Sequence, residues 1–184
     1  MKLELITPQT ANNEVKPLLE KVQKAYGFIP NTYGAMAHSP LAVAAYLEIN
    51  GLIEKHSTLT PQEQQVVMLS VSVENSCEYC VAAHSAVAGM VKTDPDVVQA
   101  IRNETPLPDE RLAALSSFAR SLVKNRGWVP DSEQEAFFSA GYTPAHVLEV
   151  VAINAMKTLS NYTNHLADTP LDEAFASQAW QKPA

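Results

Sequence analysis

Apolar residues recur at helical spacing along most of the chain. One stripe runs from Leu112 to Val123, another runs from Val15 to Tyr26, and most positions from Val147 to Leu159 are apolar. The last pattern predicts a long helix at the centre of the fold. No clear hairpin turn and no alternation of strands with helices accompany these stripes. We therefore expect an all-α protein of roughly eight helices joined by short loops.

Several helix starts are marked by a capping side chain placed before a proline, at Ser39-Pro40, Thr60-Pro61, Asp94-Pro95 and Thr143-Pro144. In the segment 67–73, apolar residues occupy alternate positions, as they do in a strand. This segment follows the start at Thr60, where Glu63 completes a capping box, and it has no second strand to pair with. We therefore predict a buried helix there.

The composition argues against several classes of function. Hydrophobic residues make up 46% and charged residues 18% of the 184 positions, which is typical of a globular domain. The net charge of −7 and the lack of any run of lysine and arginine argue against nucleic-acid binding. The apolar stretch Val147–Ala155 contains Glu149 and Asn154 and is too short to span a membrane. We expect neither nucleic acid nor a membrane as a partner.

The two cysteines, Cys77 and Cys80, stand three positions apart. The segment Met1–Ile6 contains an acidic residue and no small-residue cleavage site, so we infer no signal peptide and expect a cytoplasmic location. A reducing compartment disfavours a structural disulfide. The pair is therefore a candidate for chemistry.

The segment Glu74–His84 carries that candidate chemistry. If Ser76 caps a helix that begins at Cys77, then Cys77, Cys80 and His84 lie one turn apart on one face. The helix amino end stabilises a thiolate, and His84 can take the proton of Cys80 or pair with its anion. A thiolate that attacks a peroxide becomes a sulfenic acid, which a neighbouring thiol converts to a disulfide. An external dithiol then restores both thiols.

Two other interpretations of the cysteine pair stay open. A zinc site needs more ligands, and no second Cys or His pair has the required spacing, although His84 could supply a third ligand. Both cysteines could instead be inert residues of a helical core. A histidine one turn beyond a dithiol favours a functional pair, and we expect no resident metal and no cofactor.

The pattern Cys-x-x-Cys-x-x-x-His after an apolar helix resembles the active-site motif of the alkylhydroperoxidase D (AhpD-like) branch of the carboxymuconolactone decarboxylase family. Residues 69–86, LSVSVENSCEYCVAAHSA, carry this resemblance, and residues 157–172, KTLSNYTNHLADTPLD, resemble a C-terminal stretch of many members. We expect a single AhpD-like domain over residues 1–184, with its core at residues 35–172.

The resemblance implies an enzyme that reduces hydroperoxides with a dithiol. In this family pattern Cys80 is the peroxidatic residue, His84 activates it, and Cys77 resolves the sulfenic acid. The resemblance also implies a dithiol reductant, such as a lipoylated protein or thioredoxin, and a homotrimer or hexamer.

One position departs from the family pattern. The family's proton-relay glutamate lies twelve residues before the first cysteine, where this chain has Gln65. An amide cannot accept a proton as a carboxylate does. We assign the relay to Glu74, because Glu63 is already explained as the capping-box acid. AhpD also has a histidine at the position of Tyr79, between the cysteines.

Two other functions fit the same residues. A lactone-transforming decarboxylase represents the other branch of the family, which does not rely on a cysteine pair. The loss of the relay glutamate also keeps open a redox sensor without turnover. Near the end of the central helix, Asn161 or His165 could line the pocket opposite Cys80, or His165 could simply favour the helix C-terminus.

Overall fold

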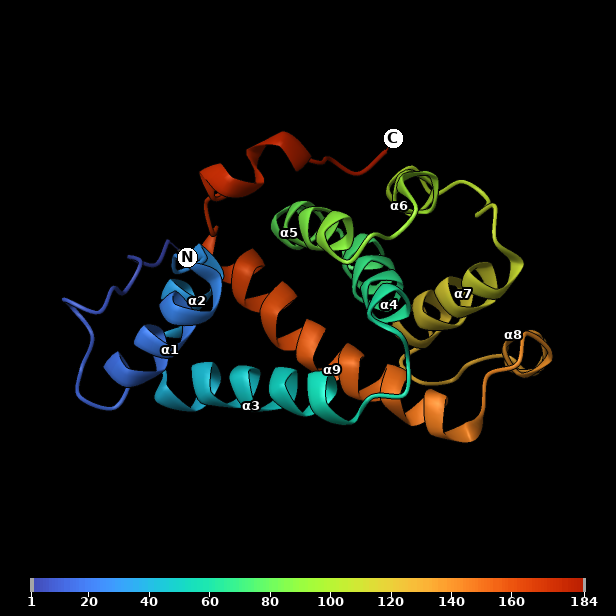
Figure 1. The fold of residues 1–184 in the computed structure, drawn as a ribbon, viewed down its shortest axis with the longest axis horizontal. Helices are drawn as coiled ribbons and strands as arrows, with labels where there is room; N and C mark the ends of the chain where they lie inside the picture. Colours follow the sequence, from blue (N-terminus) through green and yellow to red (C-terminus); the bar gives the residue numbers. More distant parts are fainter. Residues whose placement is uncertain (1, 184) are drawn as a thin grey trace.

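The computed structural model describes residues 2–183, which form an all-helical fold with no strand among them (Figure 1). Eight of its ten helices have seven or more residues, so the prediction of an all-α protein is confirmed. The helices are α1 (Lys16–Tyr26), α2 (Asn31–Met36), α3 (Pro40–His56), α4 (Pro61–Glu74), α5 (Glu78–Met90), α6 (Pro95–Arg102), α7 (Glu110–Lys124), α8 (Asp131–Ser139), α9 (Pro144–Ala167) and the 3-10 helix η1 (Glu173–Gln178).

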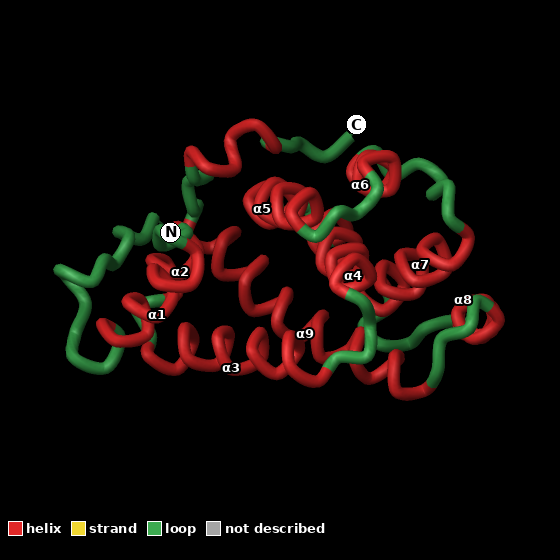
Figure 2. Tube along the Cα trace, in the orientation of Figure 1, coloured by secondary structure: helices red, strands yellow, loops and turns green. Residues whose placement is uncertain are grey.

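The long helix α9 crosses the middle of the molecule (Figure 2). It packs against α3 on one side and against α4, α5 and α7 on the other, and its C-terminal end meets α2. The apolar residues Val150, Ile153 and Met156 point from it into the core and are fully buried. The prediction of a central helix is therefore confirmed, and α9 forms the wall against which α5 is placed.

Helix α4 lies inside the fold, between α5, α7 and α9. Every residue from Val66 to Val73 is buried, so this helix is enclosed on all sides. Its apolar residues therefore need no helical period, which explains why the segment alternates like a strand. The capping box at Thr60 is present: Thr60 Oγ1 accepts from the Glu63 amide at 3.2 Å and Glu63 Oε2 accepts from the Thr60 amide at 2.8 Å.

After α9 the chain reverses at Asp168, which has a left-handed backbone with φ of 51°. The following segment, residues 170–182, crosses α5 and is called the C-terminal strap below (Figure 1). Trp180 Nε1 donates to the carbonyl of Arg102 at 2.8 Å, and Arg102 donates to the carbonyls of Gln178 and Ala179 at 3.1 and 3.0 Å. These bonds fasten the strap to the end of α6.

Within residues 2–183, no single helix combines the length and the apolar composition that crossing a bilayer requires. Only α8 and α9 taken together reach that composition, and they are bent by 115° at their junction.

Candidate functional site

The turn between α4 and α5 places the two cysteines. Ser76 takes a left-handed backbone, with φ of 56°, and the Cys77 amide donates to the Ser72 carbonyl at 2.9 Å. Helix α5 then begins at Glu78, with Cys77 as its N-cap residue. The prediction that Ser76 caps this helix is wrong, because the tight reversal uses Ser76 as its left-handed residue. Its hydroxyl instead accepts from Lys182 Nζ at 3.1 Å.

The side chains of Cys77 and Cys80 approach to 3.3 Å, and both thiols are free. Both residues are buried, with 1% and 3% of their surfaces exposed. The hydrogen bond with Cys80 and burial raise the pKa of Cys77 above its ordinary value. Cys77 therefore stays protonated and donates its S–H to Cys80.

Cys80 is the thiol that the site favours as an anion. Asn164 Nδ2 donates to its sulfur at 3.2 Å, and Ser160 Oγ lies 4.0 Å from it. Burial opposes ionisation, but the hydrogen bond from Cys77 and the charge of Lys157 outweigh it and hold the pKa of Cys80 well below its ordinary value. Of the two thiols, Cys80 is therefore the one favoured as a thiolate.

Lys157, on α9, is the cation of this site, and the sequence analysis did not single it out. Its side chain is 1% exposed, and its Nζ lies 2.7 Å from His84 Nε2. Burial would lower the pKa of Lys157, but its charge interactions with Cys80 and Tyr46 and a hydrogen bond with Cys80 raise it. A sequence signal was available, because Lys157 is the only lysine or arginine in the helix that the pattern already placed at the centre.

His84 lies one turn from Cys80 but contacts Lys157. Since the Lys157 ammonium can only donate, His84 Nε2 is the acceptor, and His84 Nδ1–H donates to Gln65 Oε1 at 3.0 Å. Burial and the charge of Lys157 hold the pKa of His84 well below its ordinary value. The imidazole is therefore neutral, and Lys157 stands at the place where the sequence analysis expected His84 to pair with the thiolate.

Glu74, predicted as the proton relay, has another partner. Its Oε2 accepts from Arg120 Nε on α7 at 3.0 Å, and the same arginine also binds Glu104. Glu74 takes part in none of the hydrogen bonds of Cys77 or Cys80. Glu63 is held by its capping box and by Arg111 at 3.0 Å, which agrees with a structural role.

The two candidates near the end of α9, Asn161 and His165, differ in their burial. Asn161 is fully buried, and it hydrogen-bonds Cys80 and accepts from Asn75 Nδ2 at 2.9 Å. His165 is exposed, with its ring stacked beside Tyr162 at 6.3 Å between centroids. The pocket wall opposite Cys80 is therefore formed by Asn161 and Asn164, which both lie on the buried face of α9.

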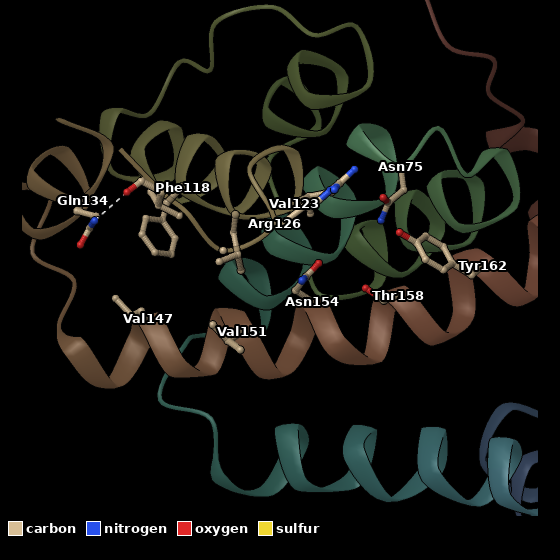
Figure 3. A pocket seen from close by; sticks show the side chains of 13 residues that line it. Asn75, Phe118, Val123, Arg126, Gln134, Val147, Val151, Asn154, Thr158 and Tyr162 are labelled. Carbon is tan, nitrogen blue, oxygen red and sulfur yellow. Dashed lines mark hydrogen bonds between the residues drawn. The ribbon is translucent and has the colours of Figure 1, made fainter. Parts of the chain in front are cut away.

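A groove of about 510 Å³ runs between α7 and α9 (Figure 3). Phe118, Val123, Val147 and Val151 give it apolar walls. Asn75 lines one end, and Asn75 is also the residue that donates to Asn161 beside Cys80. Two amide side chains therefore separate this groove from the dithiol.

The dithiol itself is covered by aromatic residues. Phe175 of the C-terminal strap and Phe28 pack with Cys77, Tyr79 and Cys80 in one apolar cluster. Tyr79 Oη donates to Asp172 Oδ2 at 2.5 Å, which ties the strap to α5. Among residues 2–183, no three His, Cys, Asp or Glu side chains converge as ligands of a metal ion.

Comparisons with known proteins agree with this architecture. Residues 40–121 match the carboxymuconolactone decarboxylase family. Among solved structures, the chain is similar to an alkylhydroperoxidase AhpD core, an uncharacterized peroxidase-related protein from Ralstonia eutropha JMP134. The two are 25% identical with a TM-score of 0.84, over 95% of this chain and 93% of that one. No curated protein sequence matches the chain.

Two further structures share the fold. An uncharacterized peroxidase-related protein from Silicibacter sp. TM1040 is 21% identical with a TM-score of 0.78, over 95% of this chain and 92% of that chain. The debrominase Bmp8 in its apo form is 18% identical with a TM-score of 0.78, over 95% of this chain and 94% of that chain. At these identities the similarity establishes the helical fold alone.

Proposed function

Residues 40–121 belong to the carboxymuconolactone decarboxylase family, and on that premise we propose that the chain is a thiol-dependent peroxidase. Cys80 is its nucleophile and Cys77 its resolving residue. The observation that carries the proposal is the thiol pair at 3.3 Å, in which Cys80 alone receives hydrogen bonds from Asn161 and Asn164. Such a dithiol supports oxidation and re-reduction better than it supports core packing.

The first half of the reaction oxidises Cys80. Its thiolate attacks the terminal oxygen of a hydroperoxide, an S–O bond forms, and the O–O bond breaks. The substrate oxygen leaves as an alkoxide and takes a proton to become an alcohol. Cys80 is then a sulfenic acid.

The second half of the reaction forms and clears the disulfide. The Cys77 sulfur displaces hydroxide from the Cys80 sulfenic acid, and that hydroxide leaves as water with the proton of the Cys77 thiol. An external dithiol then reduces the disulfide by thiol–disulfide exchange and leaves as a disulfide itself. The net change converts one hydroperoxide and one dithiol into an alcohol, water and a disulfide.

The partners in this proposal are a hydroperoxide and a dithiol reductant of the lipoylated-protein or thioredoxin type, in the cytoplasm. We also propose a homo-oligomer, a trimer or hexamer. Its support is a stripe of exposed apolar residues along the outer face of α9, where Leu148, Tyr162 and Leu166 are 70%, 54% and 62% exposed. Exposed apolar stripes of this length are typical of protein–protein interfaces.

The test follows hydroperoxide consumption with dithiothreitol as reductant, together with the mass of the protein after one equivalent of hydroperoxide. We expect the wild-type protein to turn over and to lose two hydrogens from the peptide that holds both cysteines. Cys80→Ser should abolish turnover, and Cys77→Ser should stop at the sulfenic acid. Met90→Ser is the matched control, because this exposed sulfur lies on the same helix outside the site. Full turnover in both cysteine variants would reject the proposal.

A further inference from the structure

We propose that Lys157 is the proton donor of the dithiol site: its ammonium pairs with the Cys80 thiolate and protonates the oxygen that leaves the substrate. This inference rests on the proposed peroxidase function. It assigns to a lysine on α9 the proton-transfer role that the family pattern gives to a glutamate, at the position where this chain has Gln65.

The burial of Lys157 requires an anion beside it. The side chain is 1% exposed, and no aspartate or glutamate among residues 2–183 forms a salt bridge with it. A buried ammonium without a counter-charge is strongly unfavourable. The titratable groups that face it are Tyr46 from α3, Cys80 and His84 from α5, and Cys77 at the N-cap of α5. Helix α4 contributes the neutral Gln65, which contacts His84.

Of these groups, Cys80 is the one suited to carry the negative charge. Burial raises the pKa of Tyr46, and the hydrogen bond with Cys80 and burial raise that of Cys77. His84 accepts a hydrogen bond from Lys157 and cannot be its anion. Cys80, by contrast, receives donors from Cys77, Asn161 and Asn164 in addition to the lysine. The pair is therefore Cys80 thiolate and Lys157 ammonium.

The amide at position 65 fits this arrangement better than a carboxylate would. Gln65 Oε1 accepts from His84 Nδ1, so Nε2 keeps the lone pair that receives the Lys157 N–H. A glutamate at this position would favour a protonated imidazole, whose Nε2–H would face the ammonium. Gln65 thus positions His84, and His84 positions Lys157, toward the sulfur.

Protons balance through one cycle. When Cys80 attacks and the O–O bond breaks, the Lys157 ammonium gives one proton to the alkoxide and becomes a neutral amine. Disulfide formation then releases water that contains the Cys77 proton. After a dithiol reduces the disulfide, the proton of the Cys80 thiol returns to the Lys157 amine and restores the ion pair.

The test measures the thiolate directly, without a peroxide. In a Cys77→Ser background, the ultraviolet absorbance of the thiolate and the rate of alkylation by iodoacetamide report the ionisation of Cys80 across pH. We expect Lys157→Met to lower the alkylation rate at neutral pH about tenfold or more, with the thiolate appearing only at higher pH. Lys55→Met, at an exposed position of α3, is the matched control and should leave both readings unchanged.

A second variant, on another helix, tests the inference even if Lys157→Met does not fold correctly. Gln65→Glu should also shift the appearance of the thiolate to higher pH, because the added carboxylate competes for the same cations. Thiolate curves that match the wild type in both folded variants would overturn the inference, even if the wild type consumes hydroperoxide. Shifted curves in a protein that consumes no hydroperoxide would support the Lys157–Cys80 pair and reject the peroxidase function instead.

Discussion

At the scale of single residues, the site is a chain of four polar side chains drawn from three helices. Gln65 holds His84, His84 accepts from Lys157, and Lys157 faces Cys80. Each group influences the protonation state of the next, because every donor in this chain of side chains faces an acceptor. The neutral state of the imidazole is the link that can be tested by pH.

His84 predicts a loss of stability on acidification. Its pKa is depressed in the folded protein by burial and by the charge of Lys157, so the unfolded chain binds a proton there that the folded chain refuses. The free energy of unfolding should therefore fall as the pH drops below about 6.5, by up to about 1.4 kcal/mol for each pH unit. Urea unfolding at a series of pH values measures this slope.

His84→Gln should flatten that slope, since glutamine can accept from Lys157 but does not titrate. His165→Gln, at an exposed position near the end of α9, is the control and should keep the wild-type slope. Equal slopes in the wild type and in His84→Gln would contradict the assignment of a neutral imidazole to His84.

At the scale of helices, the local chemistry of the sequence largely decides where each one begins. The capping box at Thr60 satisfies two backbone amides and starts α4, the helix that leads directly into the dithiol turn. Because α4 is enclosed by its neighbours, its first turn has no freedom to shift without moving the cysteines.

Removing this cap should destabilise the fold. Thr60→Ala deletes the oxygen that accepts from the Glu63 amide, and we expect a loss of about 1 kcal/mol in the free energy of unfolding. Ser132→Ala, in the exposed first turn of α8, should change stability much less. Thermal unfolding of both variants makes the comparison, and a Thr60→Ala protein as stable as Ser132→Ala would show that the box contributes nothing.

The helices could be predicted from sequence because caps and apolar periods are local signals. The left-handed backbone of Ser76 could not be predicted, because no local sequence signal indicates that the chain reverses so tightly between α4 and α5. Lys157 was missed for a related reason: its partners Cys80 and His84 lie more than seventy positions away. Glu74 was assigned by proximity in sequence to the cysteines, whereas the helix directs its side chain to Arg120.

At the scale of the whole molecule, the C-terminal strap closes the dithiol from solvent. Phe175 lies in the same apolar cluster as both cysteines, and the hydrogen bonds of Trp180 and Arg102 hold the strap in place. The family match ends at residue 121, so it does not include the strap. Reagents reach Cys77 and Cys80 only after some part of this cover moves.

Loosening the strap should expose the thiols. Trp180→Ala removes the donor to the Arg102 carbonyl, and we expect iodoacetamide to modify the cysteines several-fold faster than in the wild type. Trp128→Ala is the matched control, since Trp128 is 87% exposed and lies away from the strap. Equal alkylation rates in the two tryptophan variants would contradict a covering role.

The buried lysine has one more consequence. In the reduced protein its positive charge is neutralised by the Cys80 thiolate. A disulfide carries no charge, so after the proton transfer the oxidised protein holds Lys157 as a neutral amine and lacks the ion pair that stabilises the reduced form. The protein interior therefore stabilises the reduced dithiol form relative to the disulfide form. A disulfide that is disfavoured in this way is reduced readily by an incoming thiol. The site therefore favours return to the dithiol form over persistence of the disulfide.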